Sequence, residues 1–335
     1  MIRYNLILHT RARAVSLPIL LALLFLSSFA ATVHAQQIID DKLVGGPKDQ
    51  TGHFENPSKF VIANNDFMFV TCPNGVFKSD DRGVSWSPLT SSSIADFCFD
   101  ANNTLYLADD SGVFSSTDYG QTLTNLNGQL PNGPFSTVVV APNGTIFTGC
   151  KSGVFRSTDG GMNWDHKAQT EIPFGASPLC VMVTPKGTIL ARNGNSYFRS
   201  TDNGDSWATS VPLTIQIWPV TPDNILRQSD NGLERSTDDG VSWHSVPSSP
   251  QGLLFDLAMD QAGDLFTFYA YDLYISKDSG TTWSVDCIIT GGGQELGFTQ
   301  DHTLFFFRQS EGLLRTLKPL SGVKPHWNGR IFCCN

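Results

Sequence analysis

Ser79-Asp80-Asp81-Arg82-Gly83-Val84-Ser85-Trp86 is the first of six copies of one eight-residue pattern, Ser-x-Asp-x-Gly-x-(Ser/Thr)-Trp. The later copies begin at Ser116, Ser157, Ser200, Ser236 and Ser276. Measured at the third residue of each copy, the steps between them are 37, 41, 43, 36 and 40 residues. A period of about 40 residues with strand-like flanks is typical of propeller blades. The pattern therefore predicts an all-β fold, a β-propeller.

A seventh unit follows the six copies but lacks the pattern. Gly312-Leu313-Leu314-Arg315-Thr316 matches Gly232-Leu233-Glu234-Arg235-Ser236, which lies 80 residues, or two periods, earlier. Lys318 stands where the aspartate is expected. We therefore expect a single seven-bladed propeller over residues 36–320, between a signal peptide at 1–35 and a C-terminal tail at 321–335.

Each unit has the pattern of four short strands. In the third unit, Thr137–Val140 is an apolar β-branched run, and Pro142-Asn143-Gly144 marks a turn. Two further strands and the box turn follow, and Trp164 opens the fourth strand. The seventh unit has no evident fourth strand, so we expect residues 36–46 to supply it, through Ile38 and Leu43.

The first 35 residues have the pattern of a secretion signal, with Arg3, Arg11 and Arg13 before an apolar stretch and Val33-His34-Ala35 at its end. A retained membrane anchor is the alternative, but the apolar stretch is short for a span. Removal takes three arginines and no acid, so the net charge changes from −9 to −12. We expect a secreted, periplasmic or extracellular protein without nucleic-acid partners and without stable membrane insertion after signal removal.

Seven cysteines, an odd number, would then lie in an oxidising compartment. Their spacing matches no metal site, and we expect neither a metal nor a cofactor.

The eight-residue pattern resembles the Asp-box, or bacterial neuraminidase repeat, of sialidases, xyloglucanase-type glycosidases, sortilin-like receptors and photosystem II assembly factors. The resemblance covers roughly residues 45–318. It implies a propeller and leaves the activity open. A carboxylate in such a turn accepts backbone N–H bonds, and the tryptophan is an apolar anchor. We therefore expect a structural role for the box residues, Asp81, Asp118, Asp159, Asp202, Asp238, Asp278, Trp86, Trp164, Trp207, Trp243 and Trp283. The second box has Leu123 in place of tryptophan.

The face opposite the boxes is where the resemblance places a ligand. The hairpins between the second and third strands lie on that face, and we expect their side chains to bind the ligand. The binding candidates are Arg192, Arg227, Tyr269, Tyr271 and Arg308. A catalytic alternative would use loop carboxylates from the set Asp109, Asp110, Asp230, Asp272 and Glu311.

Two functions remain open. The first is a secreted, non-catalytic propeller that binds a protein or glycan through the box-free face. The second is a glycoside hydrolase or sialidase-like enzyme. The sequence has no Arg-Ile-Pro motif, which the resemblance to sialidases would require, and it has one propeller where the xyloglucanase-type enzymes have two. These departures favour binding without catalysis.

Overall fold

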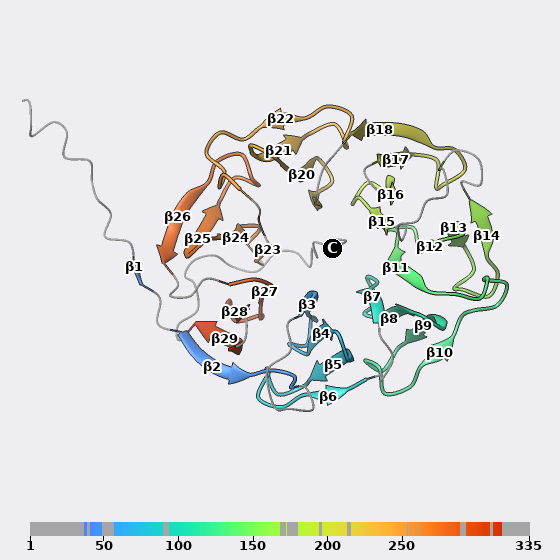
Figure 1. The fold of residues 1–335 in the computed structure, drawn as a ribbon, viewed down its shortest axis with the longest axis horizontal. Coiled ribbons are helices and arrows are strands. Elements are labelled where there is room, and N and C mark those ends of the chain that lie inside the picture. Colours follow the sequence, from blue (N-terminus) through green and yellow to red (C-terminus); the bar gives the residue numbers. More distant parts are fainter. Residues whose placement is uncertain are drawn as a thin grey trace, which may run out of the picture. The chain divides into compact units, whose positions relative to one another are not determined.

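Seven small sheets arranged in a ring make up the fold of this chain (Figure 1). The computed structural model describes residues 37–38, 41–48, 57–89, 94–167, 172, 180–193, 196–212, 216–252, 254, 256–260, 262–288, 293–308 and 311–316. All of them belong to one compact unit, Gln37–Asn335. The predicted signal peptide and the predicted C-terminal tail lie outside the described residues.

The seven-bladed propeller predicted from the repeat is confirmed. From the centre outward, the first three blades are β3 (Lys59–Ile62), β4 (Met68–Cys72), β5 (Gly75–Ser79) and β6 (Ser87–Pro88); β7 (Ile94–Phe99), β8 (Leu105–Asp109), β9 (Gly112–Ser116) and β10 (Thr124–Asn125); and β11 (Phe135–Val140), β12 (Ile146–Cys150), β13 (Gly153–Ser157) and β14 (Asp165–Lys167). The fourth and fifth blades are β15 (Cys180–Val183), β16 (Ile189–Asn193), β17 (Ser196–Ser200) and β18 (Ala208–Pro212); and β19 (Ile217–Thr221), β20 (Asn224–Ser229), β21 (Gly232–Ser236) and β22 (His244–Ser245).

The last two blades recruit strands from the N-terminal side of the chain. Blade six is β23 (Leu257–Met259), β24 (Leu265–Tyr269), β25 (Asp272–Ser276) and β26 (Ser284–Ile288), with β1 (Gln37–Ile38) added outside β26. Blade seven is β27 (Leu296–Phe298), β28 (Leu304–Arg308) and β29 (Gly312–Thr316), with β2 (Asp41–Gly45) as its outer strand. Among the described residues no helix is long and apolar enough to cross a membrane.

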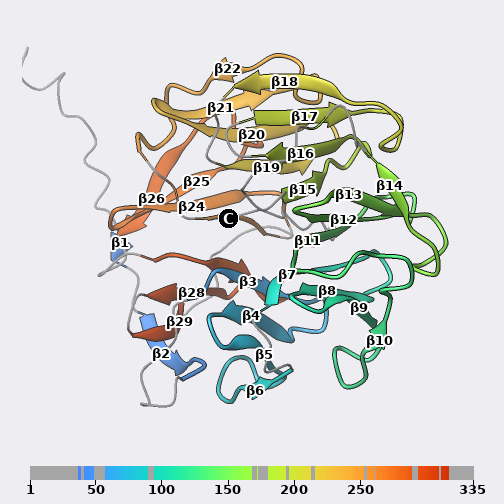
Figure 2. The ribbon, with the colours of Figure 1, turned by 45° about the vertical axis from the view of Figure 1, so that its right-hand side comes forward.

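The core lies between adjacent blades, because each sheet is apolar on both faces. All five residues of β4 and all five of β12 are buried. One cluster joins Val113 and Leu126 of blade two to Phe155 and Trp164 of blade three. Figure 2 shows the neighbouring sheets stacked face to face in this way. Burial on both faces explains the continuous apolar runs in the sequence, which do not alternate.

The box turn is a closed hydrogen-bond network. In the first box, Ser79 Oγ donates to Asp81 Oδ1 at 2.8 Å, and the Ser85 amide donates to the same oxygen at 2.8 Å. The Gly83 amide donates to Ser79 Oγ at 2.7 Å. Arg82 and Gly83 have φ of 59° and 85°, a conformation that suits glycine. The same carboxylate contacts recur at Asp118, Asp159, Asp202, Asp238 and Asp278.

Box backbones also hold neighbouring blades together. Arg156 of blade three donates to the Asn203 carbonyl in the box of blade four at 2.7 Å. Arg199 of blade four donates to the Asp239 carbonyl in the box of blade five at 3.1 Å. A recurring arginine at one position of the third strand thus serves the contact between blades.

The N-terminal segment closes the ring, and the register corrects one detail of the expectation. Leu43 pairs with Leu314, so β2 supplies the missing outer strand of blade seven as predicted. Ile38, however, pairs with Ile288 in a parallel bridge on blade six. Two residues separate β1 from β2, and this break lets the chain pass from one blade to the next.

Blade seven shows what loss of the box leaves behind. Thr316 occupies the position of the box serine, and its buried hydroxyl has no hydrogen-bond partner. We call the boundary between blades seven and one the closing seam. Arg82 of blade one bridges it, because its guanidinium donates to Asp66 Oδ2 of blade one at 2.5 Å and to Asp301 Oδ2 of blade seven at 2.8 Å. Burial would raise the pKa of Asp301, but hydrogen bonds from Thr299 and Arg82 hold it below its ordinary value. An ion-pair bridge therefore accompanies the β2–β29 pairing.

Candidate functional site

The innermost strands carry polar residues at the end that faces away from the boxes. The register places each of these residues opposite the penultimate residue of the second strand, as for Lys59 opposite Thr71 and Asp96 opposite Ala108. The equivalent positions in the seven blades are Lys59, Asp96, Thr137, Cys180, Gln216, Asp256 and Glu295. We call these seven residues the mouth ring. They surround the central axis on the box-free face.

One half of the mouth ring is a hydrogen-bonded network across three blades. Lys59 Nζ donates to Asp96 Oδ1 at 2.5 Å and to the Phe97 carbonyl at 2.6 Å. Thr137 Oγ1 lies 2.9 Å from Asp96 Oδ2 and donates to it, and the Val138 amide donates to the same oxygen at 3.2 Å. Asp96 is therefore satisfied at both oxygens and is paired with a cation.

The other half of the ring contains a carboxyl group with an altered pKa. Asp256 accepts the Leu257 amide at 2.7 Å and the Leu296 amide of blade seven at 3.3 Å. Burial raises the pKa of Asp256 to about 6, although these hydrogen bonds and the charge of Lys59 act in the opposite direction. Glu295 precedes Leu296 in the chain, and 8% of its surface is exposed. With Lys59 balancing Asp96, the ring has a formal charge of −2 when every carboxyl is ionised.

Sequence reasoning missed the mouth ring, although a signal was present. In each of the six boxed units the ring residue lies 22 positions before the box aspartate, as for Lys59 and Asp81. The constant offset follows from a nearly invariant length of the first three strands and their turns. An alignment of the six units at the box aspartate would have shown a polar residue or cysteine at this same offset in every unit.

The predicted binding arginines lie in strands, and two of them are neutralised. Arg227 is in β20, where its guanidinium donates to Glu234 at 2.5 Å and lies 4.3 Å from the ring centroid of Trp243. Arg308 ends β28 and donates to Glu311 at 3.0 Å. Arg192 is in β16, opposite Cys180 of the mouth ring. The turn signals that follow these residues favour loops, whereas the strands extend through all three arginines.

The two predicted tyrosines differ in accessibility. Tyr269 ends β24 and packs beside Gly252, where an added Cβ would lie 2.4 Å from its ring. Tyr271, in the following turn, is 62% exposed. Tyr271 is thus the exposed aromatic side chain of the predicted set.

The predicted carboxylates come from four blades. Asp109 ends β8 and is 4% exposed, and its Oδ1 accepts the Ser111 amide at 2.7 Å and the Gly112 amide at 2.9 Å. It therefore caps a turn. Asp110 and Asp230 are exposed in turns, Asp272 begins β25, and Glu311 pairs with Arg308. Among the described residues there is no cluster of three or more His, Cys, Asp or Glu that fits a metal ion.

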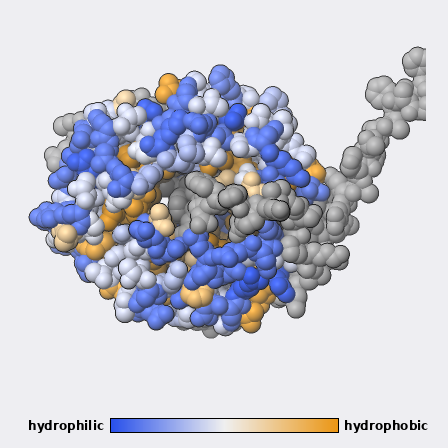
Figure 3. Space-filling view, turned by 180° about the vertical axis from the view of Figure 1, so that it is seen from behind, coloured by the Kyte–Doolittle hydropathy of each residue, from blue (hydrophilic) through white to orange (hydrophobic). Residues whose placement is uncertain are grey.

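A space-filling view shows how polarity is distributed over one side of the molecule. Hydrophilic side chains dominate the outer part of the ring there, and apolar ones show between them, some of them toward the centre (Figure 3).

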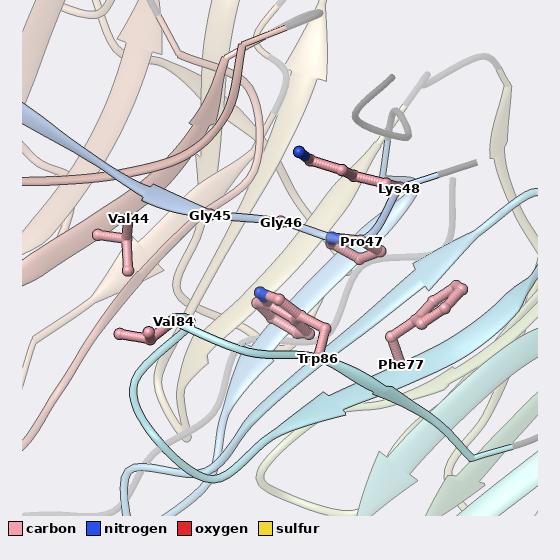
Figure 4. A pocket seen from close by; sticks show the side chains of 8 residues that line it. All are labelled: Val44, Gly45, Gly46, Pro47, Lys48, Phe77, Val84 and Trp86. Atoms are coloured by element: carbon pink, nitrogen blue, oxygen red, sulfur yellow. The ribbon is translucent and has the colours of Figure 1, made fainter. Parts of the chain in front are cut away.

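A second candidate site is a pocket of about 600 Å³ at the outer rim of the closing seam. Val44, Gly45, Gly46, Pro47 and Lys48 line one side, and Phe77, Val84 and Trp86 line the other (Figure 4).

The pocket exists because of one glycine. Gly45 pairs with Leu313 at the position that Leu89, Leu126 and Val246 occupy in blades one, two and five. A Cβ at Gly45 would lie 2.6 Å from the Gly83 carbonyl oxygen. In those three blades an aliphatic side chain occupies this position, whereas Gly45 has none, and Trp86 is half-buried.

Comparison with known proteins shows the fold. No family model and no curated protein matches the chain. Among solved structures, YCF48 bound to a D1 peptide is similar, with a TM-score of 0.60 and 20% identity over 85% of this chain and 100% of that one. Virginiamycin B lyase from Staphylococcus aureus gives 0.61 and 13% over 83% and 99%. The GH74 enzyme of Niastella koreensis gives 0.54 and 16% over 85% of this chain and 44% of the enzyme. At these identities the similarity establishes a seven-bladed β-propeller.

Proposed function

We propose that this protein is an exported, non-catalytic Asp-box propeller that binds a protein partner through the face opposite its boxes. The observation that carries the proposal is the mouth ring. Seven blades each contribute one residue to it, and six of the seven are polar. Polar groups at the centre of a face, held by strands, give a binding surface its specificity.

The charge of this face favours a basic segment of the partner. Asp110 and Asp230 are exposed around a ring of formal charge −2, and Arg227 and Arg308 are neutralised by glutamates. Tyr271 supplies an exposed aromatic side chain, a type enriched at the most important contacts of interfaces. YCF48, whose propeller is similar in fold, was solved with a bound peptide, which supports a polypeptide ligand here. A glycan is the alternative ligand.

A second candidate function is a glycosidase, and the raised pKa of Asp256 favours it. A carboxyl group with a pKa of about 6 is suited to act as a general acid. The carboxylates predicted from the sequence fit this role less well, because Asp109 caps a turn and Glu311 is paired with Arg308.

One experiment separates these functions. The purified protein is screened against arrays of basic, acidic and neutral peptides, a glycan array and a panel of fluorogenic glycosides. We expect binding to basic peptides that falls with added salt, at least tenfold weaker binding for Tyr271→Ala, and no hydrolysis. Met162→Ala is the matched control, since Met162 is 73% exposed but belongs to a box. Glycoside turnover that Asp256→Asn abolishes would establish the enzyme instead.

A further inference from the structure

The closing seam lacks an apolar contact that other blade boundaries have. Leu89 of blade one and Leu126 of blade two each pack on the box of the following blade, since a Cβ added to the glycine of that box would lie 2.8 Å from a leucine methyl carbon. Val246 of blade five belongs to the same buried cluster as Trp283 in the box of blade six. At these three boundaries the fold therefore places an aliphatic side chain against the next box.

At the closing seam the equivalent residue is Gly45, which has no side chain to offer. Trp86 of the first box is half-buried. By comparison, the box tryptophans Trp164, Trp207 and Trp283 are 6%, 9% and 6% exposed. The pocket of about 600 Å³ lies at this position, and its volume is within the range of about 300–1,000 Å³ that is typical of small-molecule sites.

The apolar wall of this pocket continues the protein core. Val44, Phe77 and Trp86 line the pocket. All three also pack against a buried cluster that includes Phe307 and Leu313 of blade seven. The ring centroids of Trp86 and Phe307 are 6.3 Å apart. An aliphatic group placed on this wall would extend an existing core, and its removal from water would favour binding.

The pocket also has a cationic side. Of the described residues that line it, Lys48 carries the only charged side chain. In Figure 4 the Lys48 amine lies across the Gly45–Gly46 stretch from Trp86, and the two glycines place no side chain there. Arg82, in the same box as Trp86, is already paired with two aspartates. An apolar side and a cationic side together match a ligand that has an aliphatic body and one negative charge.

We propose that the closing-seam pocket binds a small aliphatic carboxylate, the chemical class of the medium-chain fatty acids, with its chain on Val84 and Trp86 and its carboxylate at Lys48. The inference goes beyond the proposed function, because both the site and the ligand differ from those at the mouth ring. The ligand chain supplies the aliphatic contact that Gly45 cannot make. Because β2 and the first box line opposite sides of the pocket, the bound ligand also links the two ends of the ring.

Isothermal titration calorimetry with octanoate, kept below the concentration at which it forms micelles, tests the site. We expect saturable binding whose affinity rises about fourfold for each methylene added between hexanoate and octanoate, and a Tm that rises with ligand concentration. The neutral analogue 1-octanol should bind about fivefold more weakly, which is the upper end for an exposed ion pair. Absence of saturable binding, or equal affinity for octanol and octanoate, would refute the proposal.

Variants at exposed positions locate the ligand without disturbing the core. Val84, 68% exposed, lines the pocket, and Val84→Glu should weaken octanoate binding roughly tenfold or more, because it sets a negative charge beside the ligand. Val241→Glu is the matched control, since Val241 has the same place in the box of blade five, is 65% exposed and does not line this pocket. Parent-like Tm values without ligand show that both variants fold.

Lys48→Gln tests the charge. Octanoate should bind about fivefold more weakly to this variant, and octanol should bind as it does to the parent. Equal losses in Val84→Glu and Val241→Glu would place the binding elsewhere and overturn the site. An unchanged affinity of Lys48→Gln for octanoate would overturn the ion pair. Tyr271→Ala, which is expected to weaken peptide binding, should leave octanoate binding unaltered, so either proposal can fail while the other stands.

Discussion

Trp164 gives the sharpest test of how the blades hold together. Its side chain is 6% exposed, and its indole Nε1 donates to the Leu126 carbonyl of blade two at 2.8 Å. A buried tryptophan removes about 150–250 Å² from water, and replacement of such a residue by alanine costs about 3–5 kcal/mol. Trp164→Phe keeps most of the apolar contact but leaves a buried carbonyl unpaired, which costs about 1–3 kcal/mol.

The assay is equilibrium unfolding in urea, followed by circular dichroism so that loss of a fluorophore does not matter. Met162→Ala, an exposed position in the same box, is the control and should stay within about 0.5 kcal/mol of the parent. The reasoning fails if Trp164→Ala lies within about 1 kcal/mol of the parent, or if phenylalanine is as costly as alanine.

Three further predictions follow from the structure. Hydrogen bonds from Ser206 and Ser200 hold the pKa of Asp202 at about 2. The stability that this box carboxylate contributes is therefore present above pH 4 and is lost as the pH falls toward 2. Tm should fall between pH 5 and pH 2, and it should fall less steeply in Asp202→Asn. The raised pKa of Asp256 gives the opposite sign, because stability is lost as the pH rises from the ordinary value of 3.8 to the folded-state value of about 6. Asp256→Asn should therefore flatten the fall of Tm between pH 4 and pH 6, and an unchanged slope would contradict the assignment. Gly45→Leu forces a side chain against the Gly83 carbonyl oxygen at 2.6 Å and should lower the free energy of unfolding by about 1–3 kcal/mol, measured as a shift in the urea midpoint, whereas an unaltered midpoint would show that the seam can open.

The repeat determined what sequence reasoning could predict. The Ser-x-Asp-x-Gly core of the box is local, because the Asp81 carboxylate bonds to residues of its own turn, and a local network leaves a local pattern. The number of blades and the role of β2 followed from counting units. Ile38 was misplaced because a two-residue parallel bridge depends on the path of the chain and leaves no pattern of its own.

The site was harder to predict because it is assembled across blades. Lys59, Asp96 and Thr137 interact over 37 to 41 residues of sequence, and each alone is an ordinary polar residue before an apolar strand. For the arginines the error was the reverse, because a binding role was assigned to side chains that are already paired within their own blade. Arg227 looked like a ligand-binding residue beside a turn, but Glu234, seven residues later, neutralises it across a hairpin.

The β2–β29 pairing has a consequence for the order in which the molecule is built. Asp41 pairs with Thr316, so β2, which is synthesised before all of the inner blade strands, joins β29, the last strand of the described residues. Contacts this distant in sequence form late, and until they form, β29 is an unpaired edge that invites association with another chain. A nascent or truncated chain that ends before residue 312 cannot close, however stable its other blades are. Quality control by the cell would therefore act on a single event, the meeting of the two ends of the ring.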